Sequence, residues 1–160
     1  MKKTILTMAM GMISMLSFSQ TYQLETIFSD KSTETYLSYW KVLESSHDVE
    51  MDSFSLWGHQ LFFDDWANGA YEVEYFKGNS KETFKFLSAI NQFTEKYKNT
   101  DKVVTQISGV RVKTIKQLGF KYTLVYNKDN QVVCKFKEKH WLEMLSKFIL
   151  FCEKSNIIYK

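Results

Sequence analysis

The sequence predicts an α+β domain, with an antiparallel sheet of about six or seven strands and two amphipathic helices packed on it. Three observations support this fold class. Strand-forming segments come in two groups, and each group precedes a segment with helical periodicity. No strand–helix–strand alternation indicates a parallel sheet. No glycine-rich turn leads from a strand into a helix, as it does in nucleotide-binding folds.

Residues 1–19 have the pattern of a removable signal peptide. Two lysines precede an uncharged, mostly apolar run, and Ser17 and Ser19 place small residues before a cleavage point at Gln20. The run is shorter than the roughly 20 apolar residues that a membrane-spanning helix needs. We therefore expect residues 20–160 to form a single globular domain that is exported, periplasmic or secreted, soluble and without a membrane span.

The expected elements follow one another with short turns. Residues 35–44 fit either a helix or a strand, and their aromatic and β-branched content favours a strand. Asn79, followed by Glu82, predicts the start of a helix with a capping box. The expected strands cover 22–28, 35–44, 56–66, 71–77, one or two segments of 103–116, 121–126 and 131–137, and the expected helices cover 79–98 and 138–153.

Asn68-Gly69 gives the clearest hairpin signal, because both residues of such a turn must accept positive φ. If the loop has two residues, Asp65 faces Glu72, and Glu74 lies one step along the same face. Like charges directly opposite each other are unfavourable. Either solvent and basic side chains of a neighbouring strand, such as Arg111 and Lys113, compensate for them, or a divalent cation binds the carboxylate cluster of Asp65, Glu72 and Glu74.

Cys134 and Cys152 both lie on predicted core faces, one in a strand and one in the helix that follows. Export permits a disulfide between them. Such a bridge would close a short loop and stabilise the domain by on the order of 3 kcal/mol. The alternative is that both are small buried hydrophobic residues. The sequence leaves these two interpretations open.

Charge is divided unevenly along the chain. Residues 21–100 contain 7 Lys and 13 acidic residues, whereas residues 101–160 contain 11 Lys, one Arg and 5 acidic residues. The two halves either neutralise each other in the fold or leave a basic face that meets a polyanion or an anionic surface. The small net charge and the scarcity of Arg argue against nucleic acid as a partner.

Aromatic residues make up 16% of the chain, more than one small core requires. The hairpin around Asn68-Gly69 is partly apolar on both faces, so one face either is covered by other elements or is exposed and binds a partner or an apolar or sugar ligand. Trp57, Trp66 and Tyr71 are the candidate binding residues. No His pair has metal-ligand spacing, no nucleophile motif is present, and no cofactor is predicted.

Two functions follow from these patterns. The first is a non-catalytic exported domain that binds an unidentified protein or small ligand in the cell envelope or outside the cell. The second is a small secreted hydrolase, with or without the assistance of a metal, that uses the carboxylates within residues 64–74. The absence of recognisable catalytic spacing favours the first, so the sequence favours a protein that is not an enzyme.

Overall fold

The computed structural model describes residues 22–31, 35–42, 53–60 and 71–160. Four strands and a helix are followed by four more strands and a second helix. The elements are β1 (Tyr22–Asp30), β2 (Thr35–Val42), β3 (Ser53–Gln60), β4 (Tyr71–Gly78), α2 (Ser80–Lys96), β5 (Val104–Ile107), β6 (Val110–Gln117), β7 (Phe120–Tyr126), β8 (Val132–Phe136) and α3 (Glu138–Lys154). The strand expected within 35–44 is therefore confirmed.

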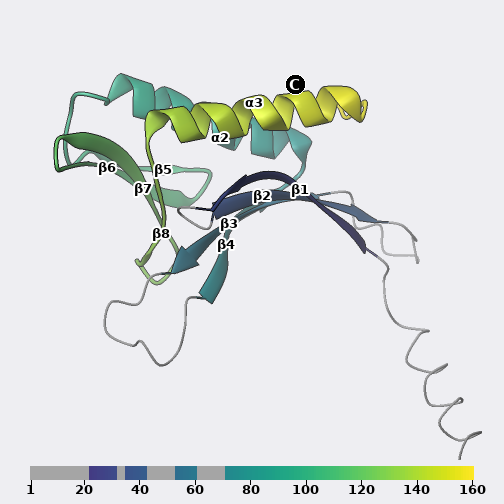
Figure 1. Ribbon diagram of the computed structural model, residues 1–160, viewed down its shortest axis with the longest axis horizontal. Helices are drawn as coiled ribbons and strands as arrows, with labels where there is room; N and C mark the ends of the chain where they lie inside the picture. Colours follow the sequence, from purple (N-terminus) through teal and green to yellow (C-terminus); the bar gives the residue numbers. More distant parts are fainter. Residues whose placement is uncertain (1–21, 32–34, 43–52, 61–70) are drawn as a thin grey trace, which may run out of the picture.

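The α+β class and the antiparallel pairing are confirmed, but the prediction of one sheet is wrong. Strands β1–β4 form one four-stranded sheet, sheet A, and strands β5–β8 form another, sheet B. In each sheet the strands are neighbours in chain order. Figure 1 shows the two sheets next to each other, with both helices on one side of them. Because α2 separates β4 from β5 in the chain, the second group of strands pairs within itself.

The register expected for the first hairpin is also wrong. In the structure β3 ends at Gln60, and Glu72 pairs with His59 instead of Asp65. The turn at Asn68-Gly69 lies outside the described residues. The expectation assumed a two-residue loop, whereas ten residues separate the ends of the two strands.

A bulge in β4 changes the direction of Tyr75. The register shifts between the pairs Leu56–Phe76 and Trp57–Glu74, so Tyr75 is the extra residue. Both Tyr75 and Phe76 are buried, although they are consecutive. A bulge commonly redirects a side chain in this way. Here it turns Tyr75 toward Cys134 of sheet B.

The two sheets meet where β3 approaches β8. A Cβ atom placed on Gly58 would lie 1.9 Å from the carbonyl oxygen of Val133. Only a residue without a side chain permits this approach. Phe28 and Phe136 add an edge-to-face contact between the sheets, with ring centroids 6.0 Å apart. The junction is therefore held by main-chain proximity and buried rings.

The two helices cover the inner faces of the sheets. Asn79 and Glu82 form the expected capping box at the start of α2. Helix α3 lies over sheet A, where Phe148 packs on Phe54 and Phe151 packs on Tyr39. The buried residues of α3 are Trp141, Met144, Phe148 and Cys152, whereas Leu142 is exposed. No helix in the described ranges is long and apolar enough to cross a membrane.

Candidate functional site

Three of the predicted site residues lie on one face of sheet A. Trp57 in β3 pairs with Glu74 in β4, and Glu72 lies two residues away on the same strand. Tyr71 begins β4, but its side chain is outside the described part of the chain. Trp66 and Asp65 both lie outside the described residues. The binding role and the carboxylate cluster therefore stay predictions.

Tyr36, which the sequence analysis did not include among the site residues, organises this face. It lies directly opposite Trp57, and the two rings stack with centroids 6.0 Å apart and an interplanar angle of 13°. Its hydroxyl donates a hydrogen bond of 2.5 Å to Glu72. Burial, this hydrogen bond and the charge of Glu72 raise the pKa of Tyr36, so the hydroxyl stays protonated and remains a donor.

His59 completes the group on the other side of the same carboxylate. Its Nε2 atom lies 3.8 Å from Oε1 of Glu72. We call the set of Tyr36, Trp57, His59, Glu72 and Glu74 the Trp57 face. It lies on the side of sheet A away from the helices, because the alternate residues of β2 and β3 face α3. The face combines a flat aromatic surface with two carboxylates.

A cleft of about 770 Å³ adjoins the Trp57 face. One wall is the run of consecutive residues 73–77 in β4. Side chains of a strand alternate between the two faces of its sheet. Consecutive residues can therefore all line one cleft only where the cleft runs along the edge of the strand. The opposite wall consists of two turns of sheet B, within residues 106–111 and 126–130. Glu74 belongs to both the cleft and the Trp57 face.

Arg111 lies across this cleft from β4. Its guanidinium is held over the ring of Tyr126, 4.8 Å from the centroid, and it donates a hydrogen bond to Asn130. The sequence analysis placed Arg111 in a strand next to the acidic hairpin. The structure instead places Arg111 in β6 of sheet B. It faces β4 across the cleft and does not belong to the same sheet as β4.

The two cysteines form no disulfide and are both buried. Burial raises the pKa of Cys134 to about 12 and that of Cys152 to about 11. A thiol with so high a pKa carries almost no reactive thiolate at neutral pH. Of the two interpretations left open by the sequence, the structure shows small buried residues.

A second histidine lies at the junction of the sheets. The Nε2 atom of His140, near the start of α3, is 3.7 Å from Oδ2 of Asp30 in β1. Burial lowers the pKa of His140 and outweighs the opposing effect of the Asp30 carboxylate. Across the described ranges, no three His, Cys, Asp or Glu side chains are grouped closely enough to bind a metal ion.

Comparison of the chain with protein-family models, curated protein sequences and solved structures finds no match. The chemistry of its own residues is therefore the basis for inferring its function. The Trp57 face offers ring stacking and hydrogen-bond acceptors, and the cleft beside it offers room for a ligand.

Proposed function

We propose that the protein is an exported binding domain that captures a carbohydrate on the Trp57 face. The observation that carries the proposal is the stacked pair of Tyr36 and Trp57, which is joined through the tyrosine hydroxyl to Glu72. The export signal expected in residues 1–19 would deliver such a domain to a compartment where polysaccharides are available.

A sugar ring matches this combination of groups. Its C–H faces are apolar and pack on aromatic rings, and its hydroxyls donate hydrogen bonds. Ligand sites commonly pair an apolar surface with a few fixed polar groups in this manner. A carboxylate has about four acceptor positions, of which Tyr36 uses one at Glu72. Glu72 therefore keeps acceptor capacity for a ligand while its side chain is held in place.

The hydrolase alternative rests on the same face. Glu72 and Glu74 are two residues apart on one strand, so their backbone positions lie about 7 Å from each other. Paired carboxylates of glycoside hydrolases are separated by roughly 5–9.5 Å. The two functions share a ligand class, and they differ in whether the bound sugar is cleaved.

Calorimetric titration with soluble cello-, chito-, malto- and xylo-oligosaccharides tests the proposal. We expect one of these series to bind. Glu72→Gln should weaken the affinity for it by about tenfold, because a charged acceptor is replaced by a neutral one. Tyr36→Phe keeps the stacked ring but removes the hydrogen bond that holds Glu72, so we expect a smaller loss of affinity than in Glu72→Gln. Glu25→Gln, on the helix side of sheet A, is the matched control and should bind like the wild type.

The outcome decides between three possibilities. Absence of binding across the panel, or binding that Glu72→Gln leaves unchanged, would refute the carbohydrate site. Release of shorter sugars by the wild type, lost in Glu72→Gln while weakened binding is still measurable, would favour the hydrolase. Binding without any release of product supports the binding domain.

A further inference from the structure

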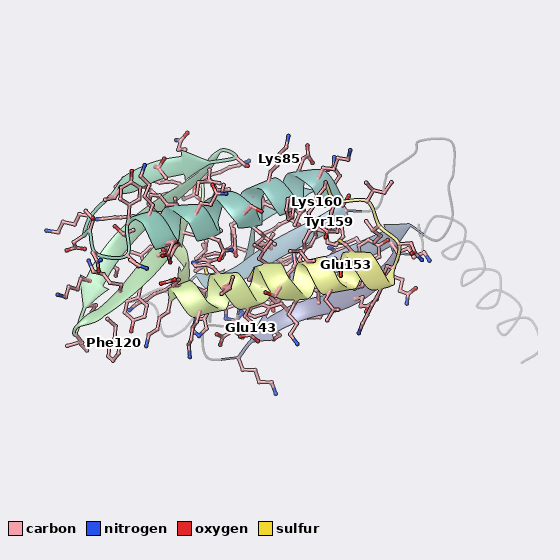
Figure 2. The ribbon with its side chains drawn as sticks, turned by 90° about the horizontal axis from the view of Figure 1, so that it is seen from above. Lys85, Phe120, Glu143, Glu153, Tyr159 and Lys160 are labelled. Atoms are coloured by element: carbon pink, nitrogen blue, oxygen red, sulfur yellow. The ribbon has the colours of Figure 1, made fainter. Side chains whose placement is uncertain are left out.

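The hairpin turn between β6 and β7 exposes two large apolar side chains. This turn, residues 117–120, is called the β6–β7 tip. Leu118 is 90% exposed and Phe120 is 54% exposed. Figure 2 shows Phe120 at one end of the molecule, far from Glu153 and Lys160 at the other. Scattered exposed apolar residues are common, but two of them together at a projecting turn indicate an interaction site.

The backbone of the tip makes Leu118 still less expected. Leu118 has a φ of 50° and Gly119 a φ of 81°, so both turn residues are in the left-handed region. Turns of this type favour Asn-Gly or Asp-Gly, and a leucine there costs roughly 1–2 kcal/mol. The turn between β5 and β6 has nearly the same two φ angles, but it uses Ser108-Gly109. Leu118 therefore helps neither the turn nor the core.

Lysines surround the tip on both sides of the hairpin. Lys116 and Lys121 are directly opposite each other in the β6–β7 ladder, which is unfavourable for like charges. On the other side, Lys137 lies over the Phe120 ring, 4.0 Å from its centroid, and Lys135 donates a hydrogen bond of 2.5 Å to Gln117. Strands β5–β8 contain no acidic residue.

These lysines have no carboxylate partner in the described part of the chain. The ion pairs found there join Lys98 to Glu95 and two histidines to carboxylates elsewhere. Lys135 and Lys137 lie over the rings of Tyr122 and Phe120, and Lys135 also donates to the Gln117 amide. Near Lys116, the Asp101 carboxylate accepts a hydrogen bond from the main-chain N–H of that residue, and no ion pair with the Lys116 ammonium is found among the described residues. Four of the eleven lysines in residues 101–160 therefore surround an apolar protrusion.

We propose that the β6–β7 tip docks the protein on an anionic lipid bilayer. Leu118 and Phe120 enter the boundary between headgroups and acyl chains, and the surrounding lysines contact the anionic headgroups. A hydrophilic polyanion would account for the lysines but would gain nothing from Leu118. Stacked bases are disfavoured as well, because the Lys137 ammonium already covers a face of the Phe120 ring. Docking adds to the proposed carbohydrate binding and does not depend on it.

Vesicle flotation tests this docking. The sample is produced through an export pathway, and mass spectrometry checks that residues 1–19 have been removed. This check is needed because the apolar run of residues 5–18 would bind lipid if it were retained. We expect binding to vesicles of equal parts phosphatidylglycerol and phosphatidylcholine, and little binding to phosphatidylcholine alone. Added salt should weaken the binding, because it screens the lysine charges.

Leu118→Asn is the decisive variant. It introduces the residue that this turn prefers, so the melting temperature should stay the same or rise. Loss of the inserted leucine should weaken vesicle binding at least about tenfold. Leu142→Gln removes a leucine that is 57% exposed on α3, and as the matched control it should bind like the wild type.

Three results would overturn the proposal. They are failure of the wild type to bind the anionic vesicles, equal binding by Leu118→Asn and the wild type, and binding to soluble polyphosphate that vesicles do not compete. None of them bears on the oligosaccharide titration, because the Trp57 face is on the other sheet.

Discussion

Gly58→Ala should destabilise the protein strongly by forcing the two sheets apart. The new Cβ atom would lie 1.9 Å from the carbonyl oxygen and 2.8 Å from the carbonyl carbon of Val133. Contacts of a Cβ atom below 3.0 Å are essentially never found, so the β3 and β8 backbones would have to separate by about 1 Å. Both strands are held in hydrogen-bonded sheets and cannot rotate away as a side chain would.

The expected loss is about 3 kcal/mol or more. Overpacking a core typically costs 1–3 kcal/mol, and this clash is between main-chain atoms, which places it at the upper end. The contact of Phe28 with Phe136, which also bridges the sheets, would be disturbed by the same movement. A domain of this kind has roughly 5–15 kcal/mol of total stability, so the loss is a large fraction of it.

Urea unfolding followed by tryptophan fluorescence measures this loss. Gly109→Ala is the matched control, because no atom lies within 4 Å of its added Cβ and the variant therefore creates no clash. Its only cost comes from the φ of 80° at this position. It should lose only about 1–2 kcal/mol, which is the cost of the left-handed backbone. A loss at Gly58 that is under about 1 kcal/mol, or smaller than the loss at Gly109, would show that the sheets do not depend on this close approach.

Three further changes test other parts of the structure. Asn79→Ala should lower the free energy of unfolding by about 1 kcal/mol, because it removes the cap of α2, and an unchanged urea midpoint would contradict this. Because burial lowers the pKa of His140, protonation favours the unfolded chain, and stability should fall as the pH drops below about 6.5. His140→Gln should reduce that fall, and identical pH profiles would count against the assignment. Cys134 and Cys152 should not react with a thiol reagent in the native protein and should both react after unfolding, whereas a disulfide would leave both unreactive in either state.

The helices could be predicted from the sequence because their signals are local. Asn79 and Glu82 are three residues apart, and the capping box they form depends on nothing else in the chain. The apolar residues of α3, such as Phe148 and Cys152, recur at helical spacing and are buried as expected. The strands of sheet B were also expected, apart from shifts of one or two residues at their ends.

The division into two sheets could not be predicted in this way. Strand pairing is set by contacts between residues distant in the chain, and the approach of Gly58 to Val133 where the sheets meet is likewise indicated by no local pattern of either residue. The hairpin at Leu118 was missed because leucine is not a residue that marks a turn. The register of the first hairpin required a loop length that the Asn-Gly signal alone does not provide.

The candidate site was anticipated in part. Trp57, Glu72 and Glu74 were singled out, and they do lie on one face, although through a different register from the one expected. Tyr36 was missed as a site residue because residues 35–44 fitted both a helix and a strand. Had the strand been certain, alternation would have placed Tyr36 and Trp40 on one face, but the pairing with Trp57 is set by tertiary structure.

The position of α3 over sheet A has a consequence for folding during synthesis. Phe148 and Phe151 cover Phe54 and Tyr39, from which they are separated by most of the sequence. During synthesis the first four strands emerge well before the residues that shield their inner face from water. Contacts of such long range slow folding, and the core can close only when the C-terminal helix has been released. The first half of the nascent chain therefore keeps the inner face of sheet A partly uncovered until α3 has been synthesised.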